Sequence, residues 1–260
     1  MLILLSPAKA LNFEPQREEL ATTRPAFMAR TEALSKVTAN LKAQDLKDLM
    51  GISDDLATLN VERFKAFHPQ ANEGLKAAAL AFNGEVYRGL EAETLSETDL
   101  QWAQDHLRIL SGFYGALRPL DAIQPYRLEM GTRLKNPKGN TLYDFWGDDI
   151  RAHLDELAKA DPHPLIVNLA SNEYAKAARP KALKTPVIAC DFKEEKNGQL
   201  RALMVYAKKA RGMMARWIIE EKPESLEDLK AFTSGGYRFQ GEGAKPGTLL
   251  FTRPQPEKKT

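Results

Sequence analysis

The sequence of 260 residues contains only one cysteine, Cys190. A single cysteine excludes an intramolecular disulfide and fits a reducing compartment, so we expect the protein in the cytoplasm. Long hydrophobic runs are lacking too. The apolar opening Met1–Leu5 is broken at Ser6, Pro7 and Lys9, and no basic segment precedes it. We therefore expect a buried strand there rather than a signal peptide, and no membrane partner.

Histidine is also scarce, with four residues at positions 68, 106, 153 and 163. Neither these nor Cys190 show the spacings CxxC, HxxxH or HExxH that metal sites use. The nucleotide-binding motifs GxxxxGK[ST] and GxGxxG and the nucleophile motif GxSxG are absent as well. Cys190 follows the apolar run Val187–Ala189, which is typical of an inert core cysteine. We predict no metal site, no cofactor and no catalytic residue, although carboxylate ligands need not be near one another in sequence.

The formal net charge is only +2, but it is unevenly distributed. Residues 176–216 hold eleven Lys or Arg against three Asp or Glu, a local charge of +8, so the rest of the chain carries −6. Such asymmetry is typical of proteins that bind polyanions. The alternative is a solvated basic surface with no partner.

Short apolar runs followed by polar loops predict strands that are covered on both faces. They lie at Met1–Leu5, Leu107–Leu110, Leu165–Leu169, Pro186–Ala189 and Leu200–Tyr206. Helical patterns lie between them, at Arg24–Ala43, Asp45–Leu49, Asp54–Phe67, Asn72–Tyr87, Ser96–Leu107, Tyr143–Ala160 and Met213–Glu221, with a shorter one near Leu226–Phe232. This alternation predicts one mixed α/β domain over residues 1–260, with a mixed sheet flanked by helices.

Turn residues predict two hairpins near the end of the chain. Asn197-Gly198 is a strong hairpin signal, and Gly235–Phe239 and Thr248–Thr252 alternate like a second pair of strands. Residues 253–260 are polar, and we expect a frayed tail. Two expected helices, Asn72–Tyr87 and Ser96–Leu107, resemble a helix-hairpin-helix in gross layout, with an ordinary helical hairpin as the alternative.

The segment His106–Gly131 is unusually rich in Gly, Pro, Tyr, Arg and acids after its apolar start. Because the loops after parallel strands gather at one edge of a sheet, we expect this segment to form one wall of a basic cleft. Within it, Asp121 and Glu129 would serve either as an acid and base pair or as ion-pair partners of Arg118 and Arg127. The side chains expected to line the cleft are Ser6, Tyr114, Asp121, Tyr126, Glu129, Asn168, Ser171, Glu173 and Tyr174.

The segment Tyr206–Gly212 carries the strongest anion-binding signal. It is predicted to run from a strand directly into the helix Met213–Glu221, where helix amides and lysine charge would act on the same phosphate. The alternative is a solvated basic turn. The predicted phosphate-binding residues are Lys9, Arg118, Arg127, Lys208, Lys209, Arg211 and Arg216.

Several longer motifs together resemble one known family. They are Leu5–Lys9, Ile52–Asp54 with Leu59-Asn60, Phe82–Tyr87 with Gly89-Leu90, Leu110–Gly131, Asn168–Ser171 with Glu173-Tyr174, and Lys208–Gly212. The chain is similar, from Met1 to about Phe251, to the YaaA family of bacterial peroxide stress-resistance proteins. This resemblance implies a cytosolic protein of the oxidative-stress response that is linked to lower free iron. It also implies a basic cleft, a helix-hairpin-helix and binding to duplex or branched DNA.

These observations favour a non-enzymatic DNA-binding protein that reads backbone and shape rather than sequence. Three tyrosines, Tyr114, Tyr126 and Tyr174, would stack on unpaired bases or simply pack in the core. The alternative function is an enzyme acting on a small anionic or nucleotide-like substrate in the same cleft. Iron sequestration is a third hypothesis. The expected partner is duplex or junction DNA, and the sequence shows no obligate protein partner.

Overall fold

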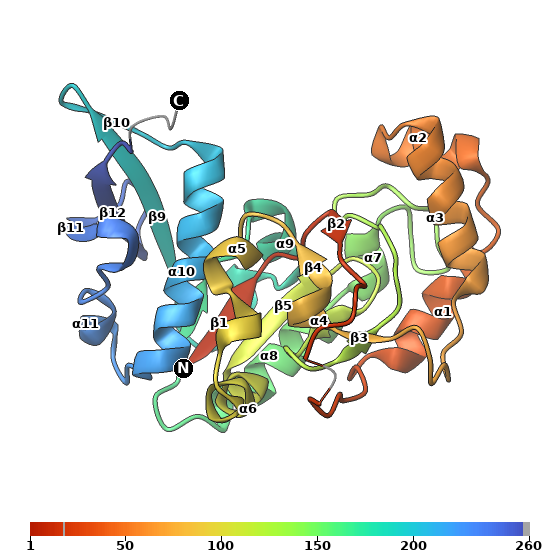
Figure 1. Cartoon of the computed structure of the whole chain (residues 1–260), viewed down its shortest axis with the longest axis horizontal. Coiled ribbons are helices and arrows are strands. Elements are labelled where there is room, and N and C mark those ends of the chain that lie inside the picture. The colour runs from red at the N-terminus through yellow and green to blue at the C-terminus, as the bar shows by residue number, and fades with distance from the viewer. Residues whose placement is uncertain (18, 257–260) are drawn as a thin grey trace.

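Five parallel strands form the centre of an eight-stranded sheet in the computed structural model, which describes residues 1–17 and 19–256 (Figure 1). Across the sheet, these are β5 (Leu107–Ser111), β1 (Leu2–Leu5), β8 (Ile166–Asn168), β9 (Val187–Lys196) and β12 (Thr248–Pro254). Three antiparallel strands extend it, with β6 (Gly115–Leu117) beside β5, β10 (Gln199–Arg201) beside β9 and β11 (Arg238–Glu242) beside β12. The predicted mixed α/β fold with a mixed sheet is confirmed.

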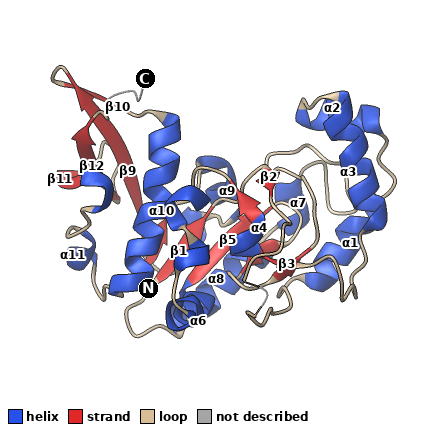
Figure 2. Cartoon of the chain, in the orientation of Figure 1, coloured by secondary structure: helices blue, strands red, loops and turns tan. Residues whose placement is uncertain are grey.

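Helices cover both faces of this sheet (Figure 2). In Figure 1, α5 (Tyr87–Leu90), α6 (Glu97–His106) and α10 (Met204–Glu221) lie in front of the strands. Behind them lie α8 (Asp149–Lys159) and α9 (Asn172–Ala177). The strands between these layers are almost fully buried, as their continuous apolar sequence predicts: all four residues of β1 are at most 3% exposed.

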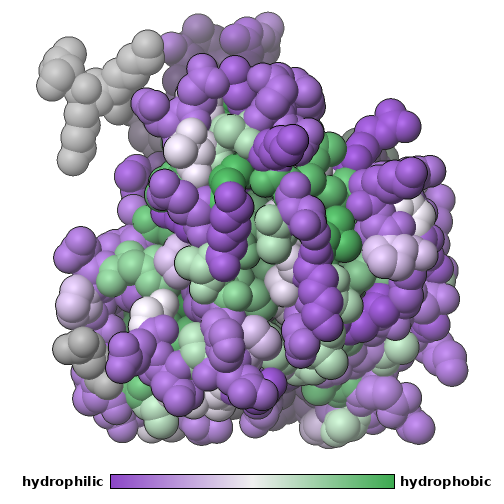
Figure 3. Space-filling view, turned by 90° about the vertical axis from the view of Figure 1, so that its right-hand side faces the viewer, coloured by the Kyte–Doolittle hydropathy of each residue, from purple (hydrophilic) through white to green (hydrophobic). Residues whose placement is uncertain are grey.

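The end of the molecule farthest from β11 is helical (Figure 1). It consists of α1 (Met28–Thr38), α2 (Ala43–Met50) and α3 (Asp54–Ala66), close to the helices predicted there. Figure 3 shows this end, where hydrophilic side chains frame the apolar residues that show between them. The remaining short elements are β2 (Ala10–Leu11), β3 (Lys76–Ala77), α4 (Ala78–Ala81), β4 (Phe82–Asn83), η1 (Ala92–Thr94), β7 (Ala122–Ile123), α7 (Leu142–Trp146), η2 (Pro180–Ala182), α11 (Leu226–Leu229) and η3 (Ser234–Gly236).

The predicted helix Asn72–Tyr87 is wrong. This segment contains only the single turn α4, between the two-residue strands β3 and β4. β3 pairs with β7 and β4 with β2, and the amides of Ala78 and Ala79 donate to the carbonyls of Asp121 and Pro119. Long-range backbone pairing therefore overrides the helix propensity of the alanines. The helix-hairpin-helix is not confirmed, because its first helix is missing.

The predicted strand Leu200–Tyr206 is also wrong. β10 ends at Arg201 and α10 already begins at Met204, nine residues before the predicted start. Lys208, Lys209 and Arg211 thus lie inside a helix rather than in a loop before one. Their amides are engaged in the helix, so the predicted use of free helix amides at this segment fails.

Both predicted hairpins are confirmed. Asn197 and Gly198 turn β9 into β10 with φ values of 53° and 74°, as a two-residue hairpin turn requires. β12 continues to Pro254, and the Gln255 amide donates to the Glu195 carbonyl, so the start of the predicted frayed tail belongs to the sheet. Residues 257–260 lie outside the described residues. No helix in the described part of the chain is long and apolar enough to cross a membrane.

Candidate functional site: a crevice at the carboxyl edge of the sheet

The candidate site lies where the strand order reverses. From β1 the chain reaches β5 on one side of β1 and afterwards β8 on the other side. In open α/β sheets, ligands bind at such a switch point, outside the carboxyl ends of the strands. Here the loops after β1 and β8 meet directly, because Ser6 Oγ accepts a hydrogen bond from the Ser171 amide at 2.9 Å and donates to Ser171 Oγ at 3.3 Å.

A crevice of about 540 Å³ opens above this serine pair. The loop after β1, the segment from β4 to α5, the start of α9 and one side of α10 form its walls. The structure brings eight of the predicted residues together here: Ser6, Lys9, Glu129, Ser171, Glu173, Tyr174, Lys208 and Arg211. The loops after β1 and β8 and the Lys208–Arg211 segment therefore line one crevice, as predicted.

Each carboxylate of the crevice already has a partner. Glu129 accepts from Lys9 at 2.8 Å and from Arg127 at 3.2 Å, one on each oxygen. Glu173 Oε1 accepts from the Gly131 amide at 2.9 Å. The third carboxylate, Glu85, is bound to Arg88 at 2.6 Å. The acids at this site are thus neutralised or hydrogen-bonded locally.

Two cations of the crevice have no such partner. Among the described residues, no acid forms an ion pair with Lys208 or Arg211, and neither side chain makes a hydrogen bond. Lys208 is exposed, whereas Arg211 is half-buried beside β9. Burial lowers the pKa of Arg211, and the nearby Asp191 opposes that shift. A partly desolvated, unpaired guanidinium at a crevice favours an anionic ligand.

Arg118 and Asp121 do not belong to this crevice, contrary to prediction. β6 runs antiparallel to β5, with Leu117 opposite Ile109, so the next residue, Arg118, lies toward the amino end of the parallel strands. There Asp121 is fully buried and accepts from the amide and side chain of Arg118 at 2.8 and 3.1 Å, and from Thr23 at 2.7 Å. The sequence could not show this reversal, because β6 is only three residues long.

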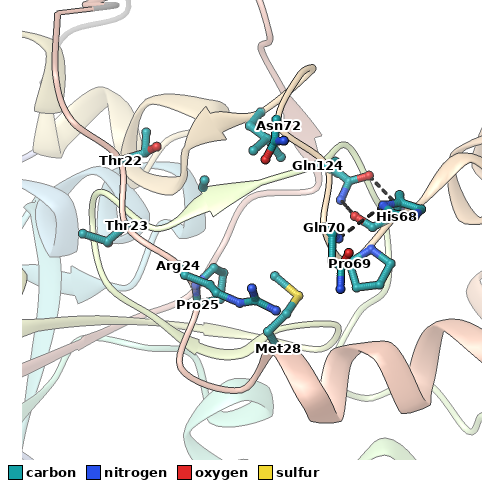
Figure 4. A pocket seen from close by; sticks show the side chains of 13 residues that line it. Thr22, Thr23, Arg24, Pro25, Met28, His68, Pro69, Gln70, Asn72 and Gln124 are labelled. Carbon is teal, nitrogen blue, oxygen red and sulfur yellow. Dashed lines mark hydrogen bonds between the residues drawn. The ribbon is translucent and has the colours of Figure 1, made fainter.

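A separate cavity of about 280 Å³ lies near that opposite end. Figure 4 shows Arg24 and Met28 on one side of it and His68 and Gln124 on the other. The Gln124 amide group is held by the backbone of His68, through hydrogen bonds of 3.0 and 2.7 Å. None of the predicted site residues lines this cavity.

Two further arginines are engaged within the protein. Arg216 donates to the carbonyls of Leu90 and Glu91 at 3.2 and 2.9 Å and forms an ion pair with Glu220 at 2.8 Å. It therefore attaches the turn after α5 to α10, away from the crevice. Arg127 is bound to Glu129 and does not line the crevice either.

The predicted aromatic and polar lining is also incomplete. Tyr114 and Tyr126 are buried core residues with ring centroids 5.2 Å apart. Their hydroxyl groups form hydrogen bonds within the protein. Tyr126 shares a 2.6 Å hydrogen bond with Ser111, and Tyr114 accepts from the backbone amide of Gln124. Asn168 accepts from the Ala170 amide at 3.1 Å and shapes the turn after β8. Tyr174 lines the crevice but is only 8% exposed.

Some lining residues were not predicted from the sequence as site residues. Among them are Asn83, Glu85 and Val86, from the segment taken as a helix, and Met204, at the start of α10. The only signal for the first three was their place in the Phe82–Tyr87 motif. The signal for Met204 was its spacing. Met204 lies four residues before Lys208 and seven before Arg211, a spacing that places the three side chains on one side of a helix.

Cys190 takes no part in the site. It is buried in β9, 3% exposed, as its apolar surroundings predict. Burial raises the pKa of its thiol to about 12, so the unreactive thiol form dominates at neutral pH. Within residues 1–17 and 19–256, no cluster of three or more His, Cys, Asp or Glu has an arrangement that suits a metal ion.

Comparison with known proteins places this chain in a family. Residues 1–243 match the family described as peroxide stress protein YaaA. The chain is 61% identical over 256 residues to a UPF0246 protein of Maricaulis maris, covering 98% of this chain and 97% of that protein. It is 56% identical over 256 residues to a UPF0246 protein of Caulobacter vibrioides, covering 98% and 100%. The chain belongs to the YaaA peroxide stress protein family.

Proposed function

We propose that this YaaA-family peroxide stress protein binds DNA, duplex or branched, through its sugar–phosphate backbone. The observation that carries the proposal is the row of cations on α10. Lys208 and Lys209 are exposed, Arg211 is half-buried, and none of the three forms an ion pair with a described residue. Lys9 adds a third positive group at the crevice itself, beside Lys208 and Arg211, although Glu129 shares its charge.

The proposed surface is smaller than the one the sequence suggested. Arg118, Arg127 and Arg216 are already bound to acids of the protein, so they contribute little to phosphate binding. The three unpaired cations would neutralise about three phosphates. Because each neutralised phosphate contributes about −0.9 to the slope of log K against log salt, we expect a slope of about −2.7. A rise from about 50 to 200 mM salt would then weaken binding about 40-fold.

The test is salt-dependent binding of duplex and junction DNA, measured by fluorescence anisotropy. In the triple variant Lys208→Ala/Lys209→Ala/Arg211→Ala, we expect weaker binding and a nearly flat salt dependence. A control variant, Lys36→Ala/Lys65→Ala/Lys159→Ala, removes the same charge from exposed positions of other helices. Equal effects of the two variants, or none, would sink the assignment of this surface.

The proposed link to free iron is indirect. Unpaired lysine and arginine side chains attract anions and repel metal cations, so the crevice suits DNA better than iron. We propose that the protein acts on iron-dependent damage through its contact with DNA. Iron content after anaerobic purification is the check, since stoichiometric bound iron contradicts an indirect role.

An enzyme acting on a small anionic or nucleotide-like substrate is the second candidate. One observation favours it, because a crevice of about 540 Å³ has the size of small-molecule sites. Turnover of nucleotides by the purified protein, lost in Lys208→Ala, is the measurement that supports this candidate over a purely binding role.

A further inference from the structure

The crevice has one end that suits an anion. Met204, Lys208 and Arg211 lie four and three residues apart on α10 and all line the crevice. Lys208 and Arg211 have no ion-pair partner among the described residues, unlike Arg127 and Arg216. The side of α10 that faces the crevice therefore offers two unpaired cations within one helical turn.

Other walls of the crevice offer groups that suit a sugar or a base. Glu173 uses Oε1 for the Gly131 amide, and no described residue donates to its Oε2, which leaves an acceptor for a hydroxyl or amino group. Carboxylates at a switch point commonly bind ribose hydroxyls. Val86 and Met204 supply apolar surface beside these polar groups. The volume of about 540 Å³ is also far larger than a lone phosphate needs.

We infer that the crevice binds one nucleoside phosphate, with the phosphate at Lys208 and Arg211 and the nucleoside against Glu173 and the Ser6–Ser171 pair. The inference rests on the proposed function in one respect, since the ligand has two sources. It is either a free mononucleotide or an unpaired nucleotide of a bound DNA strand. Both present a phosphate and a base to the crevice, and a free mononucleotide also keeps its sugar hydroxyl groups for Glu173.

Isothermal titration with the four ribonucleoside and the four deoxynucleoside 5′-monophosphates tests the inference, with inorganic phosphate as a competitor. We expect one saturable site for at least one nucleotide, and weaker competition by phosphate alone. Lys208→Ala should weaken nucleotide binding about 10- to 100-fold, as the loss of a charged hydrogen bond does. Lys65→Ala is the control, because Lys65 is an exposed lysine of α3 that does not line the crevice. We expect it to change nucleotide binding less than twofold.

Absence of nucleotide binding to the wild type at millimolar concentration would overturn the inference. So would equal losses in the two single variants, or competition by phosphate as strong as that by nucleotide. Arg211→Met is a second variant inside the crevice, and it should also weaken nucleotide binding. Because Lys208 is exposed, Lys208→Ala tests the same site without disturbing the fold. A 5′-phosphorylated single strand that displaces the mononucleotide identifies the strand as a source, and one that binds without displacing it leaves the free nucleotide. Intact duplex binding without any nucleotide binding sinks this inference alone and leaves the proposed function standing.

Discussion

Gly212 is the position where α10 crosses α5, and replacing it with alanine tests how tightly these two helices pack. A Cβ atom at Gly212 would lie 1.7 Å from the Val86 carbonyl oxygen and 2.8 Å from the Leu90 amide nitrogen. Real Cβ atoms stay beyond about 3.0 Å, so the two helices would have to separate by about 1.3 Å. The neighbours are backbone atoms, which cannot turn away as a flexible side chain can.

Two effects of opposite sign act in Gly212→Ala. Alanine favours a helix interior over glycine by about 1 kcal/mol, whereas overpacking costs about 1–3 kcal/mol or more. Because the contact is severe and against backbone, we expect a net loss of about 2 kcal/mol, or a Tm lower by about 4–8 °C. The measurement is thermal and urea unfolding of Gly212→Ala beside Lys209→Ala, an exposed position of the same helix that should change by under about 0.5 kcal/mol. A Gly212→Ala protein as stable as the wild type, or more stable, would refute the tight crossing.

Three further predictions concern groups that are buried or half-buried. Since burial raises the pKa of Cys190 to about 12, iodoacetamide should label it at pH 8 only after unfolding, as mass spectrometry would show. Burial and then the charges of Arg108 and Arg118 lower the pKa of His153 to about 4 from 6.5. Between these two pH values the unfolded state therefore binds more protons at His153 than the folded state does. The free energy of unfolding should fall as the pH drops from about 6.5 toward 5, and it should fall less in His153→Phe. Urea unfolding at each pH checks this prediction. Asp121→Ala should cost about 3 kcal/mol by the same assay, and Asp121→Asn clearly less, because asparagine keeps an acceptor oxygen where Asp121 binds Arg118, whereas alanine leaves the Arg118 side chain only the Arg24 carbonyl.

The sequence predicted the strands that have an obvious local cause. β1, β5 and β8 are continuous apolar runs that end in polar turns, and burial between two layers of helices explains that composition. The Asn197-Gly198 turn was equally legible, since few other pairs accept two positive φ angles. Local sequence and final structure agree at these positions.

The failures have non-local causes. Residues 72–87 contain good helix formers, but their backbone pairs with β2 and β7, which lie far away in sequence. The start of α10 was hidden because Leu200–Tyr206 is as apolar as the true strands. Leu200 and Met204 are 45% and 73% exposed, so their apolar character does not reflect burial. A run of apolar residues therefore predicts a buried strand only where other elements cover both faces of the sheet.

The candidate site shows the same limit for charge. The sequence does not distinguish the positive charges of Lys208, Arg211, Arg118 and Arg216, so all four were predicted to lie in one basic cleft. What separates them is the partner each one meets in space: Arg118 meets Asp121 and Arg216 meets Glu220, while Lys208 and Arg211 meet no described acid. A paired cation offers little to an incoming phosphate, because its field is already compensated. Local net charge thus drew attention to the segment that forms the first half of α10, and only the pairing shows which of its cations have no acidic partner among the described residues.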